Sequence, residues 1–140
     1  MKKDIEFPAV KGVSVAIVRK PSEEDNQVYE WSVYLLNNND FALTNVLIAS
    51  KGYGTNAEGE QQRTSTLRHF IEEIAANDYA LIEPIDPSVF HLCNEYWVTY
   101  YVGNFGKQIY DKKFLFLPDS IVETNLQFIP QLEFEGILHV

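Results

Sequence analysis

The stretch NEYWVTYYVGNFGKQIYDKKFLFLP, residues 94–118, decides the fold. It contains two runs rich in tyrosine, tryptophan, phenylalanine and valine, separated by a glycine-bounded segment at residues 103–106. Aromatic and β-branched residues favour strands, and a short glycine-containing segment between two such runs is typical of a β-hairpin. The sequence therefore predicts an antiparallel pair of strands on either side of GNFG.

Alternation along this hairpin predicts which of its side chains are interior. Tyr96, Val98 and Tyr100 fall on one face of the first strand, and Phe114 and Phe116 fall on one face of the return strand. Successive residues of a strand point to opposite faces, so each strand has one apolar face and one mixed face. Sheets that pack a core on one side have this pattern. We predict that the aromatic face is structural and lies inside.

The same two-residue period covers most of the chain. It is clear in VSVAIV, VYEWSVYLL and LTNVLIAS, which are residues 13–18, 28–36 and 43–50. Proline, asparagine and aspartate occupy the breaks between these runs, where they favour turns. Regular short strands without a long helix predict an all-β fold, an immunoglobulin-like or fibronectin-like antiparallel β-sandwich. The length of 140 residues is that of one domain, so we predict a single domain over residues 1–140.

Residues 64–86, TSTLRHFIEEIAANDYALIEPID, allow two interpretations. Leu67, Phe70, Ile71 and Ile74 follow the spacing of a helical stripe, which indicates a short helix over residues 64–76. AAND reads as a compact turn, however, and YALIEP reads as a partner strand. We predict a hairpin centred on AAND, with the short helix as the alternative.

Net charge and cysteine content exclude several kinds of partner. The formal charge is −9, which disfavours a phosphate backbone or an anionic membrane surface. The single cysteine, Cys93, excludes an intramolecular disulfide framework and fits a reducing compartment. The N-terminal segment has no uninterrupted apolar stretch of signal-peptide type. We therefore expect a cytoplasmic protein that binds neither nucleic acid nor membrane.

Residues with catalytic or metal-binding chemistry are few. His69 with Glu72 and Glu73 would begin a metal site if the segment were helical, but a third ligand position is not identified. His91 and Cys93 fall on one side of an extended strand, yet no second cysteine or orienting residue accompanies them at a recognisable spacing. We predict no catalytic, cofactor or metal site, and no enzymatic activity.

Exposed aromatic residues offer a different site. The mixed face of the hairpin contains Trp97 and Tyr101, and Tyr53 lies in residues 51–64, which read as an exposed, mobile glycine-rich loop. Aromatic rings that reach solvent stack on sugars or pack against partners. These three residues are candidates for a ligand or partner surface.

The C-terminal segment, residues 119–140, has more apolar residues than a free tail. It is therefore expected to pack on its own sandwich or on a partner, which includes a second copy of the chain. Phe128, Leu132 and Phe134 are its candidate partner residues. The large apolar residues of the segment are Leu126, Phe128, Ile129, Leu132, Phe134, Ile137 and Leu138.

Five segments resemble a small uncharacterised bacterial family of about this length. They are MKKDIEFPAV, NNNDFALTNVLIASKGYG, TSTLRHFIEEI, YDKKFLFLP and IPQLEFEGIL, and together they span nearly the whole chain. Some members of that family are labelled phenylalanyl-tRNA synthetase-like, which implies aminoacylation. A class II synthetase core places an ATP site and its motif arginines on a large antiparallel sheet with helices. This chain has neither that length nor that pattern, so the resemblance supplies no site residue.

These observations favour a non-catalytic cytoplasmic protein-interaction module, whose partner is another protein or a second copy. The alternative is a β-sandwich that binds a small ligand or carbohydrate through its exposed aromatic residues. Fold does not decide between the two, because both functions occur on sandwiches. The decision depends on which side chains meet at the surface.

Overall fold

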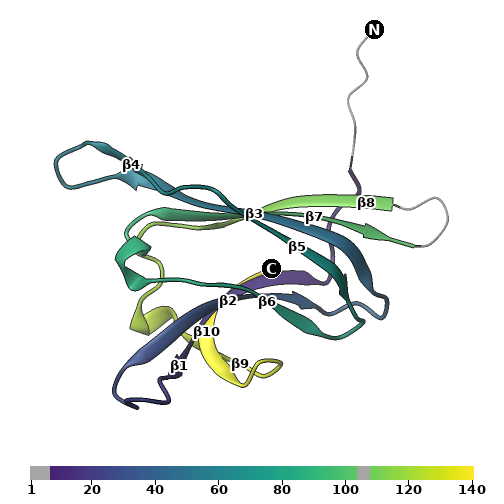
Figure 1. Cartoon of the computed structure of the whole chain (residues 1–140), viewed down its shortest axis with the longest axis horizontal. Coiled ribbons are helices and arrows are strands. Elements are labelled where there is room, and N and C mark those ends of the chain that lie inside the picture. Colours follow the sequence, from purple (N-terminus) through teal and green to yellow (C-terminus); the bar gives the residue numbers. More distant parts are fainter. Residues whose placement is uncertain (1–6, 104–107) are drawn as a thin grey trace, which may run out of the picture.

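The computed structural model describes residues 7–103 and 108–140. Two antiparallel sheets pack face to face, which confirms the predicted β-sandwich (Figure 1). Two 3-10 turns, η1 (Pro87–Val89) and η2 (Glu123–Asn125), are the helical elements of these described residues. Sheet A has the order β6-β2-β1-β10-β9, formed by Tyr79–Pro84, Tyr29–Asn37, Val13–Pro21, Phe134–His139 and Gln127–Ile129.

Sheet B is built around one long strand. β3 (Leu43–Thr55) pairs with β7 (Cys93–Val102) on one edge, and β7 pairs with β8 (Gln108–Phe116). The other edge of β3 is shared by β5 (Leu67–Ile74) and β4 (Gln61–Arg63). The predicted antiparallel pairing across GNFG is confirmed in β7 and β8, while residues 104–107 of its turn lie outside the described residues.

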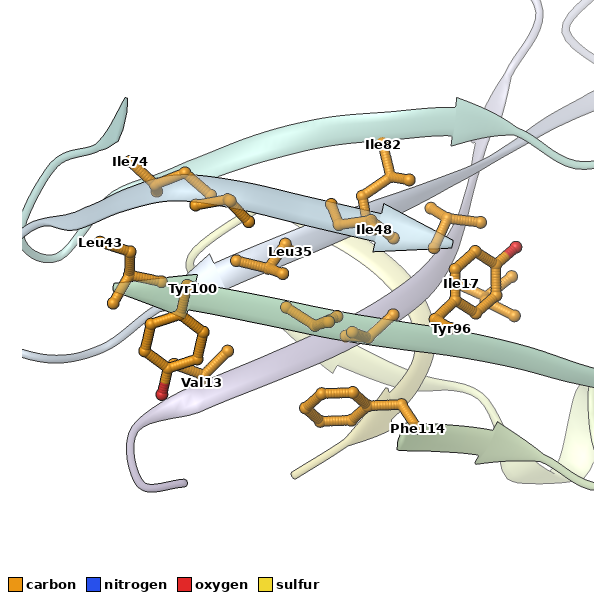
Figure 2. Packing of buried hydrophobic residues seen from close by; sticks show 14 of the residues in the cluster. Val13, Ile17, Leu35, Leu43, Ile48, Ile74, Ile82, Tyr96, Tyr100 and Phe114 are labelled. Atoms are coloured by element: carbon orange, nitrogen blue, oxygen red, sulfur yellow. The ribbon is translucent and has the colours of Figure 1, made fainter. Parts of the chain in front are cut away.

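The core fills the space between the sheets. Figure 2 shows Tyr96, Tyr100 and Phe114 of sheet B facing Ile17 and Leu35 of sheet A. All five side chains are buried, and for Tyr96, Tyr100 and Phe114 this is what the alternation in the hairpin predicts. Burying a large apolar side chain contributes about 1.5–3 kcal/mol, so this interior accounts for the density of aromatic residues in the sequence.

The predicted hairpin around AAND is wrong in its pairing, although both of its strands exist. β5 joins sheet B and β6 joins sheet A, so the chain crosses between the sheets at residues 75–78. The buried amide of Asn37 stabilises this crossing, because its Nδ2 donates to the carbonyl oxygens of Phe41, Ile74 and Ala75. The helical alternative is also wrong, because residues 67–74 form a strand.

The predicted loop over residues 51–64 is wrong for residues 51–55 and 61–63, which form strands. β3 continues to Thr55 and pairs with β4, with Tyr53 opposite Arg63. The resulting hairpin projects beyond the sandwich (Figure 1). The sequence did not predict this strand, because its segment contains three glycines and glycine lowers strand propensity. Gly52 and Gly54 lie against Leu92, where a larger side chain would be crowded.

The C-terminal segment completes sheet A. β10 lies between β1 and β9, and Gly136 pairs with Val18 at a point where a Cβ would overlap the carbonyl oxygen of Ile17. A second apolar cluster covers the outer face of sheet A, so this face has its own small core. Its buried members are Ala16, Val18, Leu36, Ile129 and Leu132.

Arg19 of β1 holds η2 against sheet A. Its guanidinium donates to both carboxylate oxygens of Glu123 at 2.7 and 2.8 Å and lies 4.1 Å from the ring centroid of Tyr29. This bidentate pair holds the pKa of Glu123 below its ordinary value.

Within the described residues, no helix is long and apolar enough to cross a membrane.

Candidate functional site

The outer face of sheet B presents rows of side chains that run across four neighbouring strands, β5, β3, β7 and β8. Cross-strand partners in a sheet point to the same side, so the register identifies which residues meet there. One row is Phe70, Leu47, Thr99 and Asp111, and the next is Arg68, Ala49, Trp97 and Lys113.

Apolar side chains on this face are unusually exposed. Phe70 is 60% exposed, Leu47 is 50% exposed and Trp97 is 41% exposed. Leu47 and Phe70 are direct cross-strand partners. Ala49 follows two residues after Leu47 on β3 and is the cross-strand partner of Trp97, and its side chain is only a methyl group. We call the six residues Leu47, Ala49, Arg68, Phe70, Trp97 and Lys113 the docking face.

Trp97 is held in place by its neighbours. Its Nε1 donates to Asp111 Oδ1 at 2.8 Å, and the same oxygen accepts the Thr99 hydroxyl at 2.6 Å. The ammonium of Lys113 lies 4.3 Å from the ring centroid, a cation–π distance. An indole fixed on several sides loses little conformational freedom when it binds a partner, so Trp97 is suited to act as an anchor.

Beside Trp97 the docking face is hollowed. A depression of about 210 Å³ is lined by Leu47, Ala49, Arg68, Trp97 and Thr99, together with parts of Ile48 and His69. Ala49 is the cross-strand partner of both Arg68 and Trp97, and its small side chain leaves this space open. The depression can hold one apolar side chain of a partner.

Of the predicted surface residues, the structure brings three to this face of sheet B. Trp97 is at its centre, Tyr53 lies toward the β3–β4 hairpin, and Tyr101 lies toward the opposite end of β7. The three do not form one aromatic cluster, because three residues of β7 separate Trp97 from Cys93, the partner of Tyr53. Only Trp97 lines the depression.

The three C-terminal candidates lie on the other sheet. Leu132 is buried in the second apolar cluster, and Phe134 packs partly buried against it. Phe128 is 62% exposed on the short edge strand β9. Leu132 and Phe134 therefore stabilise the chain's own sandwich, and Phe128 alone of the three reaches solvent fully.

His69 has a different neighbour from the acids predicted beside it. Its Nε2 lies 2.6 Å from Glu83 Oε1, which also accepts the Ser50 hydroxyl at 2.7 Å. The other oxygen of Glu83 accepts the Tyr96 hydroxyl at 3.2 Å. Burial, reinforced by Glu83, raises the pKa of Tyr96. We call Ser50, His69, Glu83 and Tyr96 the Glu83 cluster.

The Glu83 cluster does not have the geometry of a nucleophilic triad. In such a triad the histidine lies between the nucleophile and the acid. Here the carboxylate lies between Ser50 and His69, so the imidazole cannot take the serine proton through that contact. Glu83 comes from sheet A and its three partners come from sheet B, so the cluster ties the sheets together.

His91 and Cys93 do not meet as a pair either. His91 Nε2 lies 2.8 Å from Gln62 Oε1, on the β4 hairpin. Cys93 lies opposite Tyr53, and its hydrogen bond, with burial, raises the pKa of that phenol to about 12. Over residues 7–103 and 108–140, no group of three His, Cys, Asp or Glu side chains could hold a metal ion.

Comparisons with protein-family models, with characterised proteins and with solved structures give no match for this chain. The resemblance to the bacterial family therefore remains a prediction. Sequence reasoning missed Leu47, Ala49 and Phe70, because their role depends on cross-strand register. The one available signal was Phe70, which a strand places on the face opposite to Ile71.

Proposed function

We propose that this protein is a non-catalytic protein-interaction module that uses the docking face. The observation that carries the proposal is the exposed set of Leu47, Phe70 and Trp97 on one sheet face, where Leu47 and Trp97 line a depression. Contiguous apolar side chains at a surface mark binding sites more often than scattered ones do. Tryptophan and arginine, which lie beside each other here, are also among the residue types that contribute most to binding energy at protein interfaces.

Charge favours an acidic partner. The chain has a formal charge of −9, yet Arg68 and Lys113 flank the docking face on both sides of Trp97. Asp111, the acid nearest to the indole, is engaged by the hydrogen bonds from Trp97 and Thr99. We therefore propose that the partner is an acidic protein segment that inserts one aromatic or aliphatic side chain between Trp97 and Arg68.

The strand order supports placing the fold with immunoglobulin-like domains. In those domains strands A, B and E are neighbours in one sheet, and the other sheet contains C, F and G, with C′ beside C in the variable type. Strands β1, β2 and β6 would be A, B and E, while β5, β3, β7 and β8 would be C′, C, F and G. The β9–β10 hairpin is then an addition beside β1. A cytoplasmic location fits the single cysteine, Cys93.

The test uses synthetic peptides of the proposed chemistry. A glutamate-rich peptide with one central phenylalanine is titrated into isotope-labelled protein. Two control peptides are titrated in the same way: one has alanine in place of the phenylalanine, and the other has lysines in place of the glutamates. We expect saturable shifts in β3, β5 and β7 from the first peptide, weakening as salt rises. Loss of the phenylalanine or reversal of the peptide charge should weaken binding at least ten-fold.

Variants locate the surface. Ala49→Leu fills the depression and Arg68→Glu reverses the charge beside it, so both should abolish the shifts. Lys11→Glu, an exposed site before β1, is the matched charge control and should bind normally. No saturable binding by the acidic peptide, or binding that survives Ala49→Leu and Arg68→Glu, would contradict the proposal.

A further inference from the structure

A second hollow lies on the same side of sheet B, between the β3–β4 hairpin and the start of β7. Its volume is about 670 Å³. Its lining includes six polar or aromatic residues that we call the polar groove. They are Lys51, Tyr53, Gln62, Arg63, Thr66 and Glu95.

Glu95 is the unusual member of the polar groove. Its side chain is only 8% exposed, yet Tyr53 supplies one long hydrogen bond of 3.3 Å to Oε1. Lys51 Nζ is 3.8 Å from Oε2, which is outside hydrogen-bonding distance. A carboxylate has about four acceptor positions, and a buried one is normally well supplied with donors. Glu95 can therefore accept further hydrogen bonds from a molecule in the groove.

Glu95 is suited to accept hydrogen bonds from uncharged donors of a ligand. Lys51 already occupies the position of a cation beside the carboxylate, so a ligand ammonium would meet a like charge there. Hydroxyl groups have no such conflict. Thr66 adds a further neutral hydroxyl to the lining.

The groove also favours a negative group on the ligand. Lys51 and Arg63 contribute two positive charges against the single negative charge of Glu95. Arg63 lies opposite Tyr53 in the hairpin, so its guanidinium and the phenol ring belong to the same side of the sheet. A guanidinium binds a carboxylate through two parallel hydrogen bonds, and the phenol ring offers an apolar surface to a sugar ring.

We propose that the polar groove binds an acidic saccharide, a sugar that carries a carboxylate, of the uronic acid type. Its hydroxyls donate to Glu95, its carboxylate binds Arg63 and Lys51, and one face of its ring packs on Tyr53. This site is independent of the docking face, because none of the six docking residues lines the polar groove.

Glucuronate is the probe, with glucose as its neutral counterpart and free glutamate as an amino acid of similar charge. Each is titrated into isotope-labelled protein, and amide shifts are followed in β3, β4 and β7. We expect saturable shifts with glucuronate centred on Tyr53, Arg63 and Glu95, and at least ten-fold weaker binding of glucose. Tighter binding of glutamate than of glucuronate would overturn the saccharide assignment.

Variants separate the polar groove from the docking face. Glu95→Gln and Arg63→Gln should each weaken glucuronate binding at least ten-fold. Arg63 is exposed, so its variant keeps the test valid if the buried Glu95→Gln protein fails to fold. Lys113→Gln and Phe70→Ala alter only the docking face and should bind glucuronate normally. Absence of saturable shifts with glucuronate, or shifts unchanged in both groove variants, would overturn the proposal and leave the peptide-binding test unaffected.

Discussion

Glu83 Oε1 of sheet A lies 2.6 Å from His69 Nε2 of sheet B, and this contact joins the two layers across their open edge. The Glu83 side chain is 10% exposed, so its charge is largely removed from water. Three groups of sheet B compensate for that cost: the imidazole, the Ser50 hydroxyl and the Tyr96 hydroxyl. A carboxylate in this position holds β6 on the edge of the sandwich.

Glu83→Gln should therefore destabilise the fold. The amide keeps the shape of the side chain but replaces one acceptor by a donor, so at least one hydroxyl or the imidazole loses its partner. A buried polar group left without a partner costs about 1–3 kcal/mol. Urea unfolding measures the change, and Glu24→Gln in the exposed loop before β2 is the control. Equal stabilities of the two variants would show that the Glu83 cluster does not join the sheets.

Phe114→Ala and Phe70→Ala compare one substitution on the two faces of sheet B. Phe114 is fully buried, while Phe70 is 60% exposed. Removing the buried ring should cost about 3–5 kcal/mol, through lost transfer energy and a cavity. The surface variant should stay within about 0.5 kcal/mol of the parent. Both are measured by chemical unfolding, and a costly Phe70→Ala would mean that the docking face is part of the chain's own packing.

Gly136→Ala tests the close approach of β10 to β1. A Cβ at this position would overlap the carbonyl oxygen of Ile17 and crowd the side chain of Val18. Crowding of this kind costs about 1–3 kcal/mol. Gly54→Ala is the comparison with milder crowding, because its Cβ would meet a Leu92 side chain at 3.3 Å, and it should cost less. Thermal melting at several protein concentrations should show the loss for Gly136→Ala at every concentration, since the cover of this segment is its own sheet.

Tyr100 links stability to alkaline pH. Burial, with a smaller effect of Tyr110, raises its pKa from the ordinary 10.0 to about 12. A raised folded-state pKa means that the stabilisation is complete below pH 10 and is lost as pH rises from 10 through about 12. Tyr100→Phe keeps a ring for the stacking with Tyr110 and should reduce this alkaline loss. Unfolding midpoints at neutral and alkaline pH measure it, with Tyr79→Phe as the exposed control; an unchanged alkaline slope would contradict the assignment.

The local parts of the fold were readable from the sequence because they depend on neighbouring residues. Alternation placed Tyr96, Phe114 and Phe116 inside, and each is buried. The pairing of β7 with β8 followed from the same pattern and from the short glycine-bounded connection. Both inferences need only the two-residue period of a strand and the geometry of a tight turn.

The pairing around residues 75–78 was not readable in this way. A strand, a turn and a strand look the same in sequence whether the strands pair with each other or enter different sheets. The structure adds a contact that no local pattern encodes: the amide of Asn37, far along the chain, donates to the carbonyl oxygens of Ile74 and Ala75 and stabilises the crossing. Strand propensity did not predict β4 either, because its three residues are polar. β4 forms because it pairs with the end of β3.

The sequence by itself determined the class of the fold, the identity of the aromatic core and the acidic balance of the chain, because each is a property of composition or of a short repeat. Only the tertiary structure decided which surface side chains meet. Register on β3 sets Leu47 beside Phe70 and Ala49 beside Trp97, and it brings Tyr53 and Glu95 to one groove. These contacts join residues distant in the chain, and no local pattern encodes them.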